Sequence, residues 1–304
     1  MTVLFIGLGT MGEPMARNLH GYAGDNLTVF DVRPDVTEKL ARDLSVSGLS
    51  SLAAVPESVD TVVLMLPNSA IVESILQGGD GLLPRLAPGS LVIDMSSSEP
   101  ESSKALAAAA DQRGIDYLDA PVSGGQRKAV TGELSIMAGG SQKAFDRAEP
   151  LLRSMGSAVH HVGPAGSGDA AKALNNLLSA TNIAAAAEVI TAAAKFGIAP
   201  ETMVTVLNSS TGRSQASEVK YPNHILTGTF DSGFAYDLML KDLRIAQGLT
   251  GDLTTPVTDR ALAVAEENRP LLGEHPDHTE LARYYETHTS IQISNTRDNE
   301  RTQE

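Results

Sequence analysis

Phe5-Ile6-Gly7-Leu8-Gly9-Thr10-Met11-Gly12, near the start of the chain, is the stretch that decides the fold. An apolar run, residues 2–6, leads into the glycines, and a helical pattern over residues 11–21 begins within them. The first glycine permits a tight turn, the second lets backbone N–H groups approach a pyrophosphate, and the third lets helix and strand pack closely. The stretch from Gly7 to Gly12 therefore predicts a dinucleotide-binding turn, with the phosphates at a helix N-terminus. A plain strand–helix turn is the alternative.

An acidic residue follows the second predicted strand, residues 27–30. Asp31 lies about 20 residues beyond Gly12, where a carboxylate accepts hydrogen bonds from the ribose hydroxyls of the cofactor. Because such a carboxylate repels a 2′-phosphate, Asp31 favours NAD over NADP. Arg33 is able to pair with a 2′-phosphate, so NADP stays the alternative cofactor. Without the upstream glycines, Asp31 would be an ordinary turn residue or helix cap.

The first half of the chain alternates short apolar runs with amphipathic stretches. Strands are expected at residues 2–6, 27–30, 61–66, 90–93, 116–118 and 134–138, and helices at 11–21, 34–44, 70–76 and 99–113. Such alternation predicts an α/β Rossmann domain, a doubly wound parallel sheet with helices on both faces. The expected domain covers residues 1–165.

Strand signals stop near residue 169, where a long helix is predicted over residues 169–195 with eleven alanines, the best helix former. Further helices are expected at 200–208, 236–249, 255–268 and 277–287. We therefore expect an all-α C-terminal domain over residues 166–290, joined to the first domain by the long interdomain helix. Residues 291–304 are nearly all polar, and we expect a frayed tail.

The composition excludes several classes of function. The 304 residues carry 23 basic and 37 acidic side chains, a net charge of −14, which argues against nucleic-acid and anionic-membrane partners. The chain has no cysteine, which excludes disulfides and thiolate metal sites. It has no uninterrupted apolar run long enough for a membrane span. We expect a cytoplasmic protein that binds no metal.

Two segments offer chemistry for a small acidic substrate. Ser123, Gly124 and Gly125 supply a hydroxyl and consecutive unshielded N–H groups, which suit a carboxylate, although a flexible loop would look the same. Lys172 lies near the start of the long helix, and Asn175 and Asn176 follow at i+3 and i+4 on roughly the same face. Burial would lower the pKa of this lysine, as an acid/base group requires. A solvent-facing lysine is the alternative.

Together these motifs resemble the β-hydroxyacid dehydrogenase family, of which 3-hydroxyisobutyrate dehydrogenase is the best-known type. The resemblance runs from Phe5 to about residue 285. It is carried by residues 5–16, 65–68, 120–125, 166–176 and 240–243, in the family's order and approximate spacing. It implies the reversible oxidation of a β-hydroxy acid to an aldehyde or keto acid, and dimers or tetramers that pack through their helical domains.

The resemblance also implies roles for single residues. Lys172 matches the family's catalytic lysine, Asn176 matches the asparagine that orients lysine and substrate, and Ser123, Gly124 and Gly125 match the carboxylate-binding turn. Asn175 joins the substrate-binding residues. Leu66, Pro67 and Ser97 match cofactor contacts, and Lys241 matches the lysine near the nicotinamide end. Alone, Lys241 would be part of an ordinary charged helix face.

The sequence departs from the family after the Ser-Gly-Gly turn, where Gln126-Arg127-Lys128 replaces small residues. The two cations either extend the anion site or are solvated, so the substrate stays open. A reductase of another small acidic aldehyde, such as tartronate, succinic or sulfonated semialdehyde, is the alternative enzyme. A non-catalytic dinucleotide-binding module is the alternative from a different class.

Overall fold

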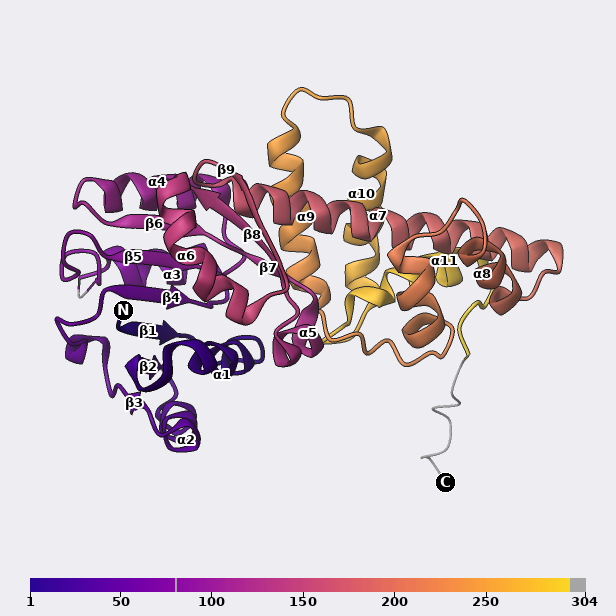
Figure 1. Cartoon of the computed structure of the whole chain (residues 1–304). Helices are drawn as coiled ribbons and strands as arrows, with labels where there is room; N and C mark the ends of the chain where they lie inside the picture. The colour runs from indigo at the N-terminus through magenta and orange to yellow at the C-terminus, as the bar shows by residue number, and fades with distance from the viewer. Residues whose placement is uncertain (80, 296–304) are drawn as a thin grey trace. The chain divides into compact units, whose positions relative to one another are not determined.

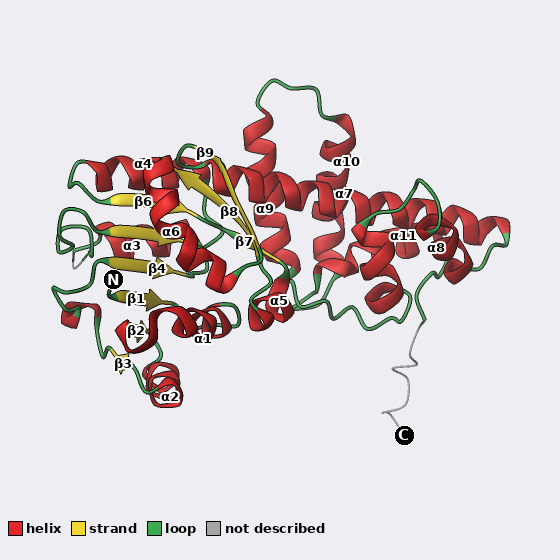
Figure 2. Cartoon of the chain, in the orientation of Figure 1, coloured by secondary structure: helices red, strands yellow, loops and turns green. Residues whose placement is uncertain are grey.

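The computed structural model describes residues 1–79 and 81–295. The chain divides into two compact units, Met1–Lys172 and Ala173–Glu304. Strands and flanking helices make up the first unit, and helices make up the second (Figures 1 and 2). The predicted fold class, a Rossmann unit followed by a helical unit, is confirmed.

One sheet organises the first unit, in the strand order β3-β2-β1-β4-β5-β6-β8-β7, with β9 paired to β8. Its long parallel part places β1 in the centre, between β2 and β4, with registers such as Phe5 opposite Val29 and Val63. The strands are β1 (Val3–Ile6), β2 (Leu27–Phe30), β3 (Ser47–Gly48), β4 (Thr61–Leu64), β5 (Leu91–Asp94), β6 (Asp116–Asp119), β7 (Val122–Ser123), β8 (Ser135–Gly140) and β9 (Ala158–Gly163).

One edge of the predicted parallel sheet contains antiparallel pairs. Strand β8 runs antiparallel to β6 and β7, and parallel to β9. Only the short helix α5 (Gly125–Thr131) joins β7 to β8. A parallel neighbour needs a crossover of a dozen or more residues, so this short connection returns the chain in the opposite direction.

Alternation along the strands divides the apolar core of the first unit between the two faces of the sheet. Val3 and Phe5 face one side, with Met15 and Leu19 of α1 (Gly12–Ala23). Leu4 and Ile6 face the other, where the buried partners come from α3 (Ser69–Gln77) and α4 (Pro100–Asp111). The fully buried strands explain why these segments are continuous apolar runs rather than alternating ones.

The sequence prediction missed several elements of the first unit. Helices α5 and α6 (Gln142–Met155) and strands β3, β7 and β9 were not expected, whereas α2 (Pro34–Leu44) was. Strands of two residues carry no readable pattern, and Pro150 interrupts the helical pattern of α6. Two 3₁₀ turns, Gly24–Asn26 and Leu52–Ala54, complete the connections.

Helix α7 (Ser167–Phe196) is the long alanine-rich helix that the sequence predicts. It is long and apolar enough to cross a membrane by length and composition alone. In the second unit, however, its residues Leu177, Ile183 and Ile190 belong to the buried core. Small alanines between them let neighbouring helices approach closely, which accounts for the composition.

The second unit contains α8 (Pro200–Asn208), α9 (Tyr236–Thr250) and α10 (Pro256–Asn268), close to their predicted positions. A π-helix, η3 (Ala216–Ile225), was not predicted. The single helix expected at 277–287 is a 3₁₀ turn, η5 (His278–Ala282), followed by α11 (Arg283–Thr289); a further 3₁₀ turn, η4, spans Arg269–Leu271.

The prediction of a frayed tail over residues 291–304 was wrong for residues 293–295. Ile293 is buried, the Glu286 carboxylate accepts hydrogen bonds from the backbone amides of Ile293 and Ser294, and Asn295 N donates to Leu226 O at 2.8 Å. Backbone groups satisfied by distant partners hold this segment, although its side chains are polar. The rest of the predicted tail, 296–304, lies outside the described residues.

Candidate active site

The turn between β1 and α1 holds the three glycines of the predicted dinucleotide motif. Gly7 has φ +95°, and a Cβ there would collide with Met65 O; a Cβ at Gly12 would collide with the Gly7 carbonyl. These two glycines therefore serve the fold. A Cβ at Gly9, by contrast, would meet nothing within 4 Å. The space above Gly9 is open, as a backbone that must admit a pyrophosphate requires.

Asp31 lies beside this turn. Its carboxylate accepts hydrogen bonds from Leu8 N at 2.8 Å and from Arg33 N at 3.0 Å, and the Arg33 guanidinium is 3.3 Å away. Burial alone raises the pKa of Asp31, but the two backbone hydrogen bonds and Arg33 hold it below its usual value. The carboxylate is thus kept ionised and fixed next to the turn, ready to accept hydrogen bonds from hydroxyl groups.

A pocket of the first unit opens over the same turn. Arg33 lines it, with its guanidinium directed to Asp31. An open backbone, a fixed carboxylate and a concave surface fit the adenosine and phosphate portion of a dinucleotide. The pocket is lined by Leu8, Gly9, Thr10, Glu13, Pro14, Arg17, Arg33, Val36, Gln126 and Val130.

The segments after β4 and β5 meet at the same edge of the sheet, because the carboxyl ends of parallel strands lie together. Leu66 N donates a hydrogen bond to Ser96 Oγ at 2.9 Å. Leu66 and Ser97 are partly exposed and Pro67 is exposed, while Ser96 is buried. The predicted cofactor contacts from these two loops are therefore neighbours.

Three buried carboxylates lie near these loops, and the sequence analysis did not identify them as a cluster. Asp94 and Asp119 end β5 and β6, and Asp169 lies in the first turn of α7. Asp119 accepts hydrogen bonds from Gly166 N at 2.8 Å and Asp169 N at 3.0 Å. The Asp169 carboxylate in turn accepts from Ser98 N at 3.0 Å and from Ser103 Oγ at 2.6 Å. An aspartate at the end of an apolar strand was the signal that could have pointed to them.

Burial dominates the electrostatics of this cluster. It raises the pKa of Asp119 to about 6, despite the backbone hydrogen bonds that lower it. Burial, together with the charges of Asp94 and Asp119, raises the pKa of Asp169 well above its usual value. Carboxylates that share a buried space cannot all be charged at little cost, so each of the three binds a proton more tightly than an exposed aspartate does.

The predicted carboxylate-binding turn is partly regular structure. Ser123 ends β7, Gly124 has φ +133°, and Gly125 begins α5, so the turn is not a flexible loop. Ser123 is partly exposed and both glycines are exposed. The hydroxyl and the following amides are accessible to an anion.

Lys172 lies one turn into α7 and is partly exposed. Of the two asparagines after it, Asn175 is exposed and Asn176 is 7% exposed. Asn175 Nδ2 donates to Asn176 Oδ1 at 3.2 Å. The two asparagines thus differ in burial, and Asn176 is the one held by its surroundings.

Asn176 is bound to α9 within the second unit. Its Nδ2 donates a hydrogen bond to Asp242 Oδ2 at 2.6 Å, and Asp242 Oδ1 lies 3.3 Å from Lys241 Nζ. Asp242 is buried and Lys241 is partly buried. These two charges therefore do not form the ordinary solvated face that the sequence allowed.

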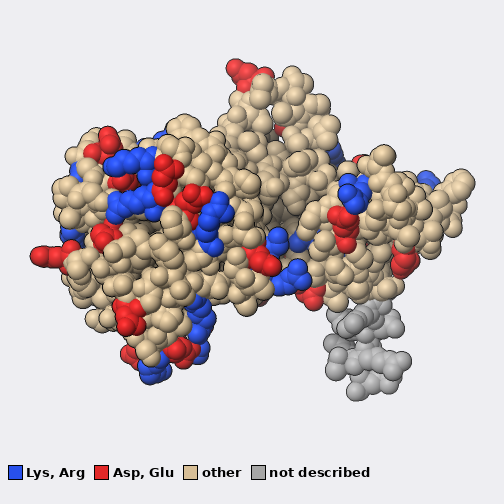
Figure 3. All heavy atoms as spheres, in the orientation of Figure 1, with Lys and Arg blue, Asp and Glu red and all other residues tan. Residues whose placement is uncertain are grey.

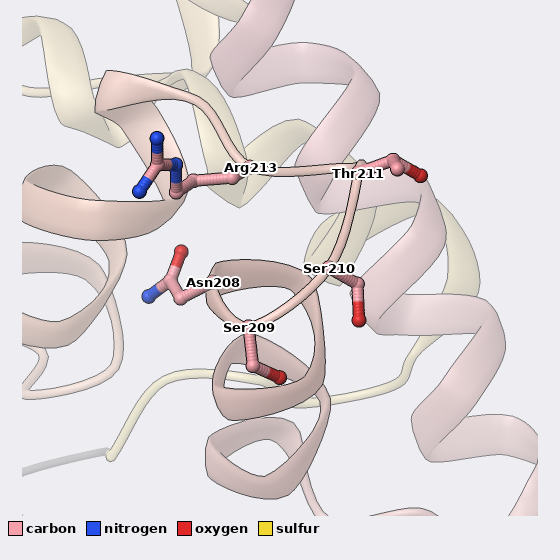
Figure 4. Close-up of a pocket in the computed structure, with 5 residues that line it drawn as sticks. All are labelled: Asn208, Ser209, Ser210, Thr211 and Arg213. Carbon is pink, nitrogen blue, oxygen red and sulfur yellow. The ribbon is translucent and has the colours of Figure 1, made fainter.

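The loop after α8 forms a second, polar pocket, lined by Asn208, Ser209, Ser210, Thr211 and Arg213 (Figure 4). Arg213 extends to one side of the loop and Thr211 to the other. Asn208 Nδ2 donates to Ser217 O at 2.9 Å, while the buried Asn208 Oδ1 has no hydrogen-bond partner among the described atoms. The Arg213 guanidinium is exposed and lies 3.5 Å from Glu218.

Within residues 1–79 and 81–295, no three His, Asp or Glu side chains gather in a way that could hold a metal ion. His161 stacks on Phe145 and hydrogen-bonds to Gly140 O at 2.8 Å. Its neighbour His160 is exposed on β9.

Comparisons with known proteins match this arrangement along the chain. Residues 2–163 match the family model described as the NAD binding domain of 6-phosphogluconate dehydrogenase. Residues 166–285 match the model described as NAD-binding of NADP-dependent 3-hydroxyisobutyrate dehydrogenase.

Individual relatives extend the match over nearly the whole chain. The chain is 38% identical to 2-(hydroxymethyl)glutarate dehydrogenase of Eubacterium barkeri, over 95% of this chain and 96% of the relative. It is 38% identical to mitochondrial 3-hydroxyisobutyrate dehydrogenase of Mus musculus, over 85% and 78%. The solved 3-hydroxyisobutyrate dehydrogenase of Mycobacterium tuberculosis with L-serine superposes with a TM-score of 0.83, at 31% identity, covering 92% of this chain and 97% of that one.

A Rossmann unit with an open glycine-rich turn and a fixed acidic residue, followed by a helical unit, defines an NAD(P)-dependent oxidoreductase. The chain belongs to the β-hydroxyacid dehydrogenase family. It is a dehydrogenase that acts on the hydroxyl group of small hydroxy acids.

Proposed function

We propose that this enzyme interconverts a small β-hydroxy acid of the 3-hydroxyisobutyrate kind and its semialdehyde or keto acid, with NAD as the preferred cofactor. The observation that carries the cofactor preference is the Asp31 carboxylate, fixed by Leu8 N and Arg33 N beside the open turn at Gly9. A 2′-phosphate at this position would meet a partly buried negative charge. Arg33, already directed to Asp31, is only partly available to neutralise it.

Each residue of the proposed site has its own role in the reaction. The Ser123 hydroxyl and the amides of Gly124 and Gly125 bind the substrate carboxylate, which fixes the hydroxyl-bearing carbon. Lys172 takes the hydroxyl proton during oxidation and returns it during reduction, an acid–base contribution of about 10²–10⁴-fold. Asn176 orients the lysine amine and the substrate oxygen. Bound NAD supplies the acceptor for the hydride that leaves the same carbon.

The proposed oxidation balances with NAD as the hydride acceptor and Lys172 as the proton acceptor. The alcohol loses a hydride and a proton and becomes a carbonyl, and both leave to groups named above. Leu66, Pro67, Ser97 and Lys241 complete the proposed cofactor contacts, and Asn175 joins Asn176 on the substrate side. Lys172 and Asn176 are four residues apart on α7 and face the same way, which supports the proposal that they act together.

Two substrates deserve the first test. The names of two relatives give 3-hydroxyisobutyrate and 2-(hydroxymethyl)glutarate. Both contain a CH₂OH group on the carbon that bears the carboxylate, and the second carries an additional carboxylate. Both therefore fit the proposed roles of Lys172 and the Ser123 turn.

We also propose that the enzyme is a cytoplasmic homodimer or homotetramer. Four apolar side chains of α7, Leu174, Leu178, Val189 and Phe196, are exposed in the single chain, with Phe196 at 85%. Light scattering after size exclusion tests the assembly; a monomer at micromolar concentration would contradict it.

The experiment for the proposed function measures NADH formation at 340 nm with a panel of β-hydroxy acids, with NAD and with NADP, for the wild type and Lys172→Ala. We expect turnover with a carboxylate substrate and NAD, and a loss of about 10²–10⁴-fold in the variant with NAD binding intact. Activity that survives Lys172→Ala overturns the catalytic assignment. NAD binding without turnover in either direction would favour the binding-module alternative.

A further inference from the structure

Lys128 lies against the proposed carboxylate-binding turn. A Cβ built on Gly124 would lie 2.6 Å from Lys128 Cδ and 2.9 Å from Lys128 Cβ. The lysine stem thus fills the space that a side chain at position 124 would need. This placement follows from helix geometry, because side chains of a helix lean toward its N-terminus and cover the preceding turn.

The aliphatic stem of Lys128 packs against the turn: Cδ is the atom nearest to a Cβ built on Gly124, followed by Cβ and Cγ at 2.9 and 3.2 Å. Lys128 is exposed, so its charged end is in contact with water.

Among the residues that the structure describes, no Asp or Glu forms an ion pair with Lys128. Several other cations of the same unit do form ion pairs; Arg17, for example, contacts Glu13 and Asp43 at 2.8 and 2.7 Å. On the face shown in Figure 3, blue and red side chains commonly adjoin one another. Lys128 thus places an exposed cation, without a carboxylate partner among the described residues, beside the proposed carboxylate-binding turn.

We propose that Lys128 forms a cationic subsite for a second acidic group of the substrate, so that the enzyme prefers β-hydroxy acids with two anionic groups. The inference rests on the proposed role of Ser123, Gly124 and Gly125 in binding the first carboxylate. That turn supplies neutral donors sufficient for one carboxylate. The ammonium of Lys128, on a stem that packs against the turn, adds a positive charge for a second acidic group of the substrate.

The subsite also explains the glycine at position 124 in a new way. Its positive φ favours glycine, and any larger residue would displace the Lys128 stem. The turn and the lysine therefore form one unit, in which the identity of residue 124 controls where the charge of residue 128 lies.

The test compares two substrates that differ by a second carboxylate, 3-hydroxyisobutyrate and 2-(hydroxymethyl)glutarate, in the wild type, Lys128→Gln and Lys128→Arg. For Lys128→Gln we expect kcat/KM for the dicarboxylate to fall about 10- to 100-fold, mainly through KM, because a hydrogen bond to a charged group is lost. The value for the monocarboxylate should change less than about threefold, the strength expected of an exposed charge. Lys128→Arg should keep most of the preference.

Arg127→Gln is the matched control. Arg127 precedes Lys128 on α5, is also exposed and forms no ion pair among the described residues, but the atoms nearest to a Cβ on Gly124 belong to Lys128 and not to Arg127. This variant should change neither substrate by more than about threefold. Added salt should raise the dicarboxylate KM of the wild type more than that of Lys128→Gln.

The possible outcomes distinguish failure of the Lys128 subsite from failure of the proposed function. An equal loss on both substrates would show that Lys128 serves the first carboxylate, and no loss on either would show a solvated lysine; both results overturn the second-acid subsite. Wild-type enzyme that oxidises only the monocarboxylate overturns it as well. If the wild type oxidises no β-hydroxy acid and reduces no aldehyde, the proposed function itself fails.

Discussion

The carboxylate of Asp169, three residues before Lys172 on α7, accepts a hydrogen bond from the backbone amide of Ser98 at 3.0 Å. Ser98 follows Ser97 in the loop after β5, and the same carboxylate accepts from Ser103 Oγ at 2.6 Å in α4. The buried Asp169 side chain thus links the first turn of α7 by hydrogen bonds to the loop after β5, which contains the proposed cofactor contact Ser97. All of these residues belong to the first unit.

Replacement of Asp169 by alanine should destabilise the first unit. The change leaves Ser98 N without its acceptor in a buried site, and an unsatisfied buried donor costs about 1–3 kcal/mol. Urea unfolding should show this loss for Asp169→Ala. Ser102→Ala is the control, because the Ser102 hydroxyl bonds to Glu73 in an exposed position and should contribute under about 0.5 kcal/mol. Equal stabilities of the two variants would contradict a stabilising role for the hydrogen bond between Ser98 and Asp169.

The pH dependence of stability should reflect the same cluster. The pKa of Asp119 is about 6 in the folded chain against an ordinary value of 3.8, so the folded state binds the proton more tightly than the unfolded state. Its contribution is fully present below pH 3.8 and is lost as the pH rises through about 6, up to about 3 kcal/mol in all. Asp94 and Asp169, whose pKa values burial also raises, act in the same direction.

Asp277 acts in the opposite direction at lower pH. Burial alone would raise its pKa, but hydrogen bonds from His278 and Thr279 hold it far below the usual value, so its stabilisation is lost as the solution is acidified below about pH 4. We expect the free energy of unfolding, from urea titrations, to be larger at pH 5 than at pH 7.5 and to fall again below pH 4. The slope between pH 5 and 7.5 should be shallower in Asp119→Asn. A stability that rises steadily from pH 5 to 7.5 would refute this account.

Much of the nucleotide-binding half of the fold could be predicted from the sequence, because its signals are local. The glycine spacing, the apolar run before it and Asp31 after the next strand lie within 31 residues, and the structure brings Asp31 to the turn through Leu8 N. The buried carboxylates could not be predicted, because their partners are distant: Asp169 and Ser98 are 71 residues apart. Nor did composition distinguish Lys241 and Asp242 from a solvated helix face; only packing in the second unit shows that Asp242 is buried and bound to Asn176.

Substitutions at Gly9 and Gly12 of the first turn should affect different properties, cofactor binding at Gly9 and stability at Gly12. Gly9→Ala adds a methyl group into open space, so it should leave thermal unfolding within a few degrees of the wild type and weaken NAD binding, since only a bound pyrophosphate would meet the methyl group. Gly12→Ala places its Cβ on the Gly7 carbonyl and should unfold or strongly destabilise the first unit. Calorimetry and NAD titration on both variants check this. Unchanged NAD affinity in Gly9→Ala would argue against a dinucleotide at this turn.

Cofactor choice should depend on Asp31. Asp31→Ser removes the negative charge and leaves Arg33 without its partner, so the guanidinium becomes available to a 2′-phosphate. The ratio of kcat/KM for NAD to that for NADP should shift toward NADP by roughly 10- to 100-fold, the effect of one charged hydrogen bond gained and one repulsion removed. Arg33→Ala in the same background should reverse the gain for NADP. A ratio that Asp31→Ser leaves unchanged would place the ribose elsewhere.

The hydrogen bond from Asn176 to Asp242 gives a test of the proposed role of Asn176 that involves only the second unit. Asp242→Ala removes the acceptor of Asn176 Nδ2 and leaves the Asn176 side chain held less firmly, with the bond from Asn175 to its Oδ1; misplacement of a catalytic group costs roughly 10- to 100-fold in kcat. Asp242→Asn keeps an oxygen that accepts from Asn176 while it removes the charge beside Lys241. If orientation of Asn176 matters, kcat should fall much further in Asp242→Ala than in Asp242→Asn. Equal losses in the two variants would show that the charge at position 242, rather than the orientation of Asn176, supports turnover.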